Sequence, residues 1–195
     1  MYQYVFKRLI DIIVSLLVFP FFLIIFILVF IAIKIEDKGP VFYIAPRLGK
    51  DMKEFPMYKF RTMIVNAPDY RNEDGTTYNA EDDPRVTKVG KFLRKTSIDE
   101  IPQIINVLKG DMSLVGPRPS PLGNIDIYPK TYLDKFKVKP GITGYNQVLL
   151  RNKSTMEQRI QNDLFYINNL SFKLDLKILI MTVFTVFKSK NIYRN

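Results

Sequence analysis

The chain has 195 residues, and 29 Lys and Arg against 19 Asp and Glu give it a formal charge of +10. It contains neither Cys nor His, which excludes disulfides, thiolate nucleophiles, catalysis that depends on His and the commonest zinc ligands. The basic balance is compatible with an anionic membrane surface or with phosphate-bearing substrates, whereas the scattering of Lys and Arg along the chain does not favour nucleic acid.

An uncharged apolar run occupies residues 12–33. It exceeds the roughly 20 residues that a helix needs to cross a bilayer, and it is too long for the apolar core of a signal peptide. Pro20 lies near its middle and removes one helical hydrogen bond, so we expect a kink. A straight tilted span and a bent re-entrant hairpin are both compatible with these residues. Basic residues flank both ends of the run and therefore do not select an orientation.

Two short β-like runs follow, at residues 41–44 and 55–63, and the second carries Lys59 and Arg61 between apolar positions. Residues 66–84 are polar, acidic and rich in turn formers, which indicates a mobile loop. This loop is either a solvated connection or a lid over a site.

Residues 85–150 contain a helical pattern of isoleucine and leucine that ends at Gly110, a typical C-cap residue. Pro140 and Gly141 suit the two central positions of a type II turn. Further on, Ser154 and Glu157 have the spacing of a capping box at the start of another helix. Residues 172–187 form a second apolar helix that Asp175 and Lys177 interrupt. Its uncharged part, 178–187, is too short to span a bilayer, so the helix lies at the membrane interface or against the core.

The segment 96–103 supports two interpretations. Ser97 and Glu100 have capping-box spacing, and Asp99 would then simply favour the positive end of a helix. Pro102 weakens that interpretation, because it would cost a hydrogen bond beyond the first turn; either the helix starts later or its first turn is distorted. Adjacent carboxylates on a helix point about 100° apart, which suits Asp99 and Glu100 to two different tasks.

The functional interpretation uses the same residues. A helix N-terminus attracts phosphate, and an ionised Asp99 there could attack phosphorus to give an acyl phosphate. Such transfer needs in-line positioning and positive charge around the non-bridging oxygens. Pro117 and Pro119 fix the backbone around Arg118, which suits a pre-aimed phosphate contact. The candidate sources of positive charge are Lys59, Arg61, Arg94 and Arg118.

Several blocks of the chain together resemble the bacterial sugar transferase family, the small monotopic phosphoglycosyl transferases. These blocks are Lys7-Arg8 with Asp11, YKFRTM at 58–63, LRKTSIDEIPQ at 93–103, NVLKGDMSLVGPRP at 106–119, KPGITG at 139–144, Gln147-Val148 and Arg151. The resemblance implies that Asp99 attacks the sugar-linked phosphorus of a UDP-sugar and releases UMP. A polyprenyl phosphate, such as undecaprenyl phosphate, would then take the phospho-sugar, with Glu100 positioning or deprotonating this acceptor.

The resemblance also implies Mg²⁺ with Asp99 as its protein contact. Phosphates would be held by Arg94, Arg118 and Arg151, with Lys59 and Arg61 as weaker candidates. The family's apolar helix bends at a Ser-Pro pair and enters and leaves on the cytoplasmic side of the bacterial inner membrane. This chain has Phe19-Pro20 instead, so the bend would depend on Pro20, with Ser15 as a possible substitute for the missing hydroxyl. No large additional membrane region of the longer relatives is recognisable, which implies the minimal form.

We therefore expect a predominantly helical α+β fold. Residues 1–34 would form a kinked re-entrant membrane helix, and residues 35–195 a small cytoplasmic catalytic domain with interfacial amphipathic helices, including 172–187. The partners would be a UDP-sugar, a polyprenyl phosphate, the bilayer and downstream glycosyltransferases. The alternative is a non-catalytic membrane-anchored module that binds anionic lipid or partner proteins. A pure anion binder gains nothing from Asp99 and Glu100 beside its cations, and no segment indicates which sugar is used.

Overall fold

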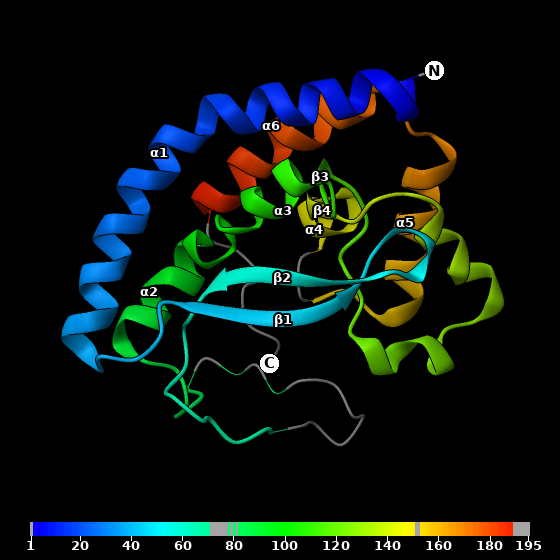
Figure 1. Ribbon diagram of the computed structural model, residues 1–195. Helices are drawn as coiled ribbons and strands as arrows, with labels where there is room; N and C mark the ends of the chain where they lie inside the picture. The colour runs from blue at the N-terminus through cyan, green and yellow to red at the C-terminus, as the bar shows by residue number, and fades with distance from the viewer. Residues whose placement is uncertain (1, 71–77, 79, 81, 151–152, 189–195) are drawn as a thin grey trace.

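The computed structural model describes residues 2–70, 78, 80, 82–150 and 153–188. Helices dominate it and two small sheets lie between them, so the predicted α+β, mainly helical class is confirmed (Figure 1). Of the predicted loop at 66–84, residues 71–77, 79 and 81 lie outside the described part. The elements are η1 (Tyr2–Phe6), α1 (Lys7–Glu36), β1 (Phe42–Leu48), η2 (Lys50–Met52), β2 (Glu54–Phe60), α2 (Lys88–Thr96), η3 (Ile98–Glu100), α3 (Gln103–Lys109), β3 (Ser113–Val115), η4 (Leu122–Ile127), η5 (Lys130–Lys137), β4 (Gly141–Thr143), α4 (Tyr145–Leu149), α5 (Met156–Asn168) and α6 (Phe172–Lys188).

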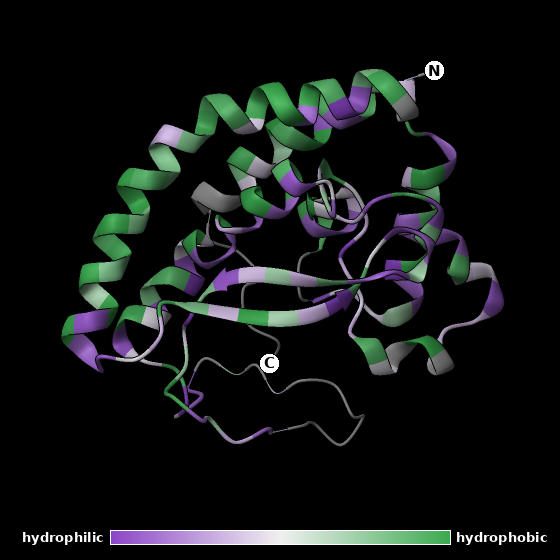
Figure 2. Cartoon of the chain, viewed as in Figure 1, coloured by the Kyte–Doolittle hydropathy of each residue, from purple (hydrophilic) through white to green (hydrophobic). Residues whose placement is uncertain are grey.

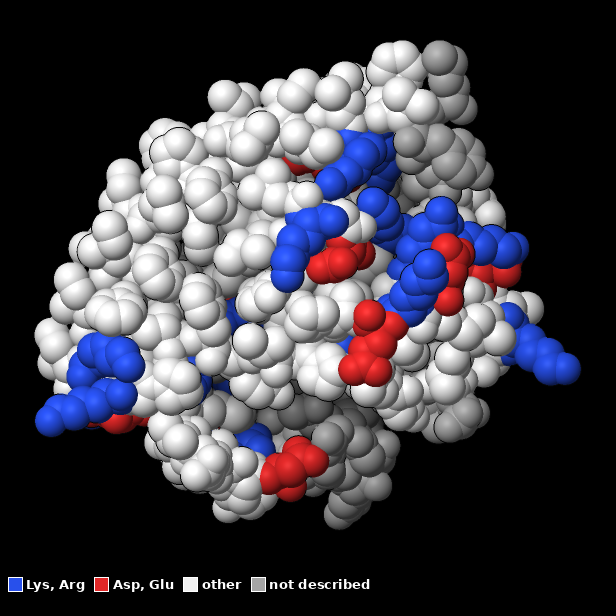
Figure 3. Space-filling model, viewed as in Figure 1, with Lys and Arg blue, Asp and Glu red and all other residues white. Residues whose placement is uncertain are grey.

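α1 is a continuous helix of 30 residues that includes Pro20. It runs along one side of the domain and then turns down a second side (Figure 1). By length and composition it could cross a membrane, and only 17% of its most apolar 18-residue stretch is buried within the protein. Its outer surface is almost entirely apolar and carries charge only near its two ends (Figures 2 and 3). These features support membrane association.

Ser15 does not take the role expected of it. Its side chain is fully buried, and its hydroxyl has no hydrogen-bond partner in the part of the chain that the structure describes. It therefore does not bridge the backbone carbonyl that Pro20 leaves without a donor, and Ser15 acts as a small packing residue instead.

The first turns of α1 are fixed to the domain by polar contacts. Lys7 pairs with Asp175 of α6 at 2.6 Å, and Arg8 donates to the last carbonyls of α3. Asp11 accepts from the hydroxyl of Ser113 and the backbone N–H of Leu114, both at 3.0 Å. The pair with Lys7 explains why Asp175 interrupts the apolar pattern of α6. The observed bounds of α6, Phe172–Lys188, agree with the helix predicted at 172–187 within one residue.

β1 and β2 form an antiparallel hairpin in which Phe42 pairs with Phe60. This confirms the two predicted strands, although they lie at 42–48 and 54–60 rather than 41–44 and 55–63. The rings of Phe26, Phe42 and Phe60 stack with centroids 5.5 to 6.3 Å apart, and Phe22 joins them from α1. The hairpin is thus packed against the second half of the apolar helix.

β3 and β4 form a short parallel pair, and β4 replaces the type II turn predicted at Pro140 and Gly141. Gly110 is the one described glycine with positive φ, at 97°, so Gly141 lacks the conformation that such a turn needs. A Cβ atom on Gly141 would lie 2.0 Å from the backbone nitrogen of Gly116. Glycine is required there for the close approach of two backbones.

One capping prediction is corrected and another is confirmed. The N-cap of α5 is Thr155, whose partner is Gln158, so the capping box lies one residue after the predicted Ser154 and Glu157. Ser154 is buried and accepts from the side-chain amide of Asn146 at 3.2 Å instead. Gly110 ends α3 in a left-handed conformation, as predicted.

Candidate active site

The turn between α2 and α3 carries the two candidate carboxylates, Asp99 and Glu100. α2 ends at Thr96 and is capped by Ser97, whose backbone is left-handed (φ 60°), and η3 follows as one 3₁₀ turn. Ser97 makes no side-chain capping bond, and α3 begins only after Pro102. The predicted capping box of Ser97 and Glu100 is therefore wrong, and the helix starts later because Pro102 fits before its first residue. The carboxylates project from a tight turn rather than from a long helix.

Glu100 joins two cations from distant parts of the chain. Its Oε1 accepts from the ammonium of Lys59 on β2 at 2.5 Å and from Nη1 of Arg118 at 3.4 Å. The side chains of Lys59 and Glu100 are 17% and 22% exposed, so the shorter pair is only partly screened by water. Glu100 thereby fixes two positive charges beside Asp99.

Asp99 has a perturbed acidity. Burial raises the pKa of its carboxyl to about 6, and the negative charge of Glu100 contributes in the same direction. The positive charges of Lys59, Arg94 and Arg118 oppose this rise in the pKa. Asp99 is therefore ionised at neutral pH, but its carboxylate is poorly solvated, and such a group is suited to nucleophilic attack on an electrophile that approaches between the cations.

Arg94 reaches this site from the last turn of α2. Its Nε donates to the hydroxyl of Thr62 at 3.0 Å, which orients the guanidinium. α2 lies directly against the segment that follows β2: a Cβ atom added to Gly90 would lie only 2.0 Å from the carbonyl oxygen of Thr62, so only glycine fits there. Sequence reasoning did not assign a role to Thr62; its place within the YKFRTM block is the signal that could have found it.

Arg118 extends from the loop after β3. The backbone of this loop is bonded to other elements on both sides of the arginine: Gly141 donates to the carbonyl of Pro117 at 3.0 Å, and Leu48 donates to that of Ser120 at 2.9 Å. The side chain of Arg118 is 46% exposed. Backbone hydrogen bonds thus hold the loop on both sides of Arg118, and the additional restraint expected from Pro117 and Pro119 stays a prediction.

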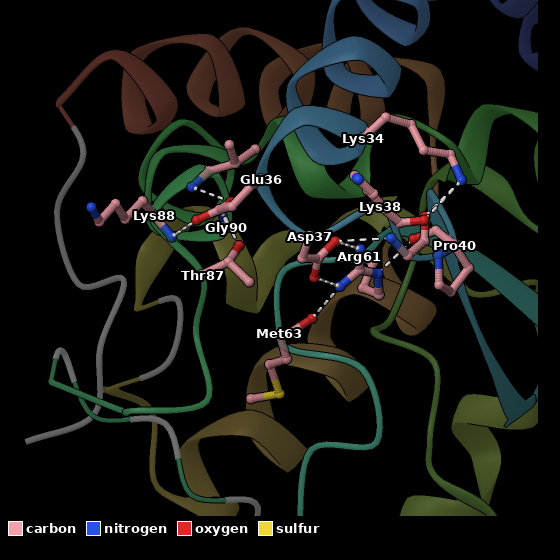
Figure 4. A network of polar contacts seen from close by, with 12 residues as sticks. Lys34, Glu36, Asp37, Lys38, Pro40, Arg61, Met63, Thr87, Lys88 and Gly90 are labelled. Carbon is pink, nitrogen blue, oxygen red and sulfur yellow. Dashed lines mark hydrogen bonds and ion pairs between the residues drawn. The ribbon is translucent and has the colours of Figure 1, made fainter.

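Arg61 makes its contacts elsewhere. It pairs with Asp37 just after α1, and it also donates to the carbonyls of Pro40 and Met63, as Figure 4 shows. The adjacent Glu36 accepts from the backbone N–H groups of Lys88 and Val89 at the start of α2. Arg61 thus anchors the end of the membrane-type helix, whereas Lys59, Arg94 and Arg118 gather around Asp99 and Glu100. Arg151 lies outside the described residues.

The described residues contain no group of three or more acidic side chains that could hold a metal by themselves. Mg²⁺ commonly binds through one or two carboxylates and completes its coordination with water and substrate phosphates. The Asp99 carboxylate, which is ionised at neutral pH, would fit that mode of binding, and the substrate would supply the remaining oxygen ligands.

A long apolar helix joined to a domain whose paired carboxylates lie among cations is typical of membrane-associated enzymes that act on phosphate esters. The family model described as "Bacterial sugar transferase" matches residues 2–189, and the chain belongs to this family.

Relatives of known name support the same assignment. The chain is 45% identical to the UDP-glucose:undecaprenyl-phosphate glucose-1-phosphate transferase of Klebsiella pneumoniae, over 97% of this chain and 42% of that protein. It is 40% identical to the uncharacterized sugar transferase EpsL of Bacillus subtilis, over 95% and 89% respectively. It is 38% identical to the UDP-N-acetylgalactosamine-undecaprenyl-phosphate N-acetylgalactosaminephosphotransferase of Aeromonas hydrophila, over 92% and 43%. The chain thus spans less than half the length of the first and third of these proteins.

Proposed function

We propose that this protein transfers a sugar phosphate from a UDP-sugar to a polyprenyl phosphate, such as undecaprenyl phosphate. The observation that carries the proposal is the Asp99 carboxylate, held with a raised pKa among Lys59, Arg94 and Arg118. The names of the Klebsiella and Aeromonas relatives specify this type of donor and acceptor for those proteins.

The reaction proceeds in two displacements. An oxygen of Asp99 attacks the phosphorus that bears the sugar; the bond from this phosphorus to the bridging oxygen breaks, and UMP leaves with the electron pair. The phospho-sugar is then held on Asp99 as an acyl phosphate. A phosphate oxygen of the polyprenyl phosphate attacks the same phosphorus, which frees the carboxylate and forms a polyprenyl diphosphate sugar. Lys59, Arg94 and Arg118 stabilise the charge on the non-bridging oxygens in both steps.

Glu100 has two roles in this scheme. It holds Lys59 and Arg118 in place in the free enzyme, and it positions or deprotonates the incoming acceptor phosphate. Mg²⁺ bound by Asp99 and the donor diphosphate would offset part of the negative charge of the substrate.

The membrane arrangement follows from α1 and α6. We infer that α1 bends at Pro20, enters and leaves on the cytoplasmic side, and keeps its exposed apolar surface in lipid. α6 leaves Phe172, Leu176, Ile180, Val183 and Phe184 exposed, which suits a helix that rests at the membrane interface. The lipid-linked product would then be available to glycosyltransferases that extend it.

The test uses the purified protein in nanodiscs with Mg²⁺, a panel of UDP-sugars and polyprenyl phosphate, and it measures UMP. The panel identifies the donor. Asp99→Asn should abolish UMP release, and labelled donor should place the phospho-sugar on residue 99 of the unchanged protein. UMP released without acceptor supports the covalent route over direct attack by the lipid phosphate. Normal turnover by Asp99→Asn would refute the nucleophile.

A further inference from the structure

A buried ionic cluster lies on the far side of Arg118 from the carboxylates, and the mechanism above does not use it. It consists of Tyr132 and Lys135 of η5 and Asp163 of α5, which are 0%, 5% and 1% exposed. Figure 1 shows the yellow-green segment that contains η5 beside α5. Lysine and aspartate are rarely buried so completely, because removing each charge from water costs several kcal/mol.

The three side chains are mutually bonded. The hydroxyl of Tyr132 donates to Oδ2 of Asp163 at 2.5 Å and accepts from the ammonium of Lys135 at 3.1 Å. Lys135 and Asp163 lie 3.9 Å apart, so their opposite charges offset each other, and Arg159 adds a further positive charge nearby. The 3₁₀ geometry of η5 places residues three apart above one another, so Tyr132 and Lys135 face the same neighbour.

Lys135 also bonds to the loop that carries Arg118. Its ammonium donates to the carbonyl oxygen of Arg118 at 3.1 Å. It lies 4.6 Å from the ring centroid of Tyr132 and 5.5 Å from that of Tyr128, so its position is restricted on several sides. Burial also lowers the pKa of Lys135, to about 8, while the negative charge of Asp163 opposes this change.

This bond completes a set of backbone restraints on the loop. The carbonyls of Pro117 and Ser120 are held by backbone N–H groups of Gly141 and Leu48, and that of Arg118 by Lys135. The two prolines further limit the backbone. The guanidinium of Arg118, by contrast, is half-exposed and extends toward Glu100. The flexible side chain of Arg118 therefore extends from a backbone segment that Lys135 helps to hold in place.

We propose that Lys135 is a positioning residue: its ammonium, neutralised by Asp163 and oriented by Tyr132, holds the Arg118 carbonyl so that the guanidinium meets the phosphates of the donor. The inference rests on the proposed function, because it assigns Arg118 a phosphate of the UDP-sugar. A structural role alone would make the cluster part of the core and leave turnover independent of it once the protein is folded.

Lys135→Met alone would leave the buried Asp163 carboxylate without its ion-pair partner, which could prevent folding. The informative variant is Lys135→Met/Asp163→Asn, which removes both charges and keeps an acceptor for Tyr132. Lys137→Met is the matched control, since Lys137 lies on η5 but is 68% exposed and pairs only with the exposed Asp134 in the described contacts. Thermal melting in nanodiscs and kcat/KM for UMP release are measured for each protein.

The double variant should melt close to the unchanged protein but lose about 10- to 100-fold in kcat/KM, since small misplacements of a substrate-binding group have effects of that size. Combined with Arg118→Ala, the double variant should cause no further loss in kcat/KM, because both changes remove the contact between the Arg118 guanidinium and the donor phosphates. Lys137→Met should behave as the unchanged protein. Unchanged turnover in a well-folded double variant would overturn the inference. So would a triple variant whose kcat/KM falls below that of Arg118→Ala by the same factor that the double variant shows alone. Failure of the proposed function looks different: the unchanged protein itself would release no UMP.

Discussion

Replacing Asp99 with Asn should stabilise the protein while it removes catalysis. Burial raises the pKa of this carboxyl from 3.8 to about 6, so the folded state binds the proton more tightly than the unfolded chain. The contribution of Asp99 to stability is thus most favourable below pH 3.8, falls as the pH rises toward 6, and stays at its lowest level above that. At pH 7.5 the ionised side chain is a net cost, which Asn removes.

The size of this effect follows from the change in the pKa. At about 1.4 kcal/mol per pH unit the rise corresponds to roughly 3 kcal/mol, and partial exposure of the side chain reduces this to about 1–2 kcal/mol. For a domain of this size such a gain raises the melting temperature by about 2–8 °C.

The assay is thermal melting of the ligand-free protein in one detergent at pH 7.5 and at pH 4. Asp99→Asn should melt higher than the unchanged protein at pH 7.5, and the difference should largely disappear at pH 4, where Asp99 is protonated in the folded state. Asp134→Asn is the control, because Asp134 is exposed and its pair with Lys137 lies at the surface. A lower melting temperature for Asp99→Asn at pH 7.5 would refute the claim that burial of this charge opposes folding.

Two further predictions concern the cations and the pH dependence. The rate of single-turnover UMP release should increase tenfold per pH unit below about pH 6 and level off above it, because only ionised Asp99 attacks. The acceptor is omitted from this assay because a phosphate monoester also titrates near pH 6. A rate that does not change between pH 5 and 7 would contradict this. Arg61→Met should reduce the free energy of unfolding by about 1–3 kcal/mol, and hence the melting temperature, through loss of the Asp37 pair, yet leave KM for the donor within about twofold. Lys59→Met, by contrast, should reduce kcat/KM at least about tenfold. A large increase in KM for Arg61→Met without loss of stability would restore Arg61 as a phosphate ligand.

Lys59 and Arg61 illustrate why sequence patterns predicted the site only in part. Both lie between apolar positions in one predicted β-run, and that pattern did not distinguish the two cations as phosphate contacts. In the structure β2 ends at Phe60, and Arg61 turns toward Asp37. Where a strand ends depends on the contacts that neighbouring elements provide. Here Asp37, just after α1, pairs with Arg61.

The same lesson applies to two turns. Pro140 and Gly141 have the residue types of a type II turn, but glycine is needed there because Gly116 approaches so closely. Ser97 and Glu100 have the spacing of a capping box, but Ser97 closes the preceding helix. Small residues and short polar side chains suit several local structures, and the sequence pattern does not show which of them the folded chain adopts.

The amino-acid sequence by itself determined the apolar helix, the helical stripes, the two β-strands and the absence of His and Cys chemistry, because these depend on composition and on periodicities within a few turns. It also singled out Asp99, Glu100, Arg94 and Arg118. Only the tertiary structure decided that Lys59 and Arg118 share Glu100, that Arg61 anchors α1, and that Lys135 reaches the Arg118 carbonyl. Those contacts join residues 17 to 41 positions apart, and pairing over such separations is set by how the elements pack.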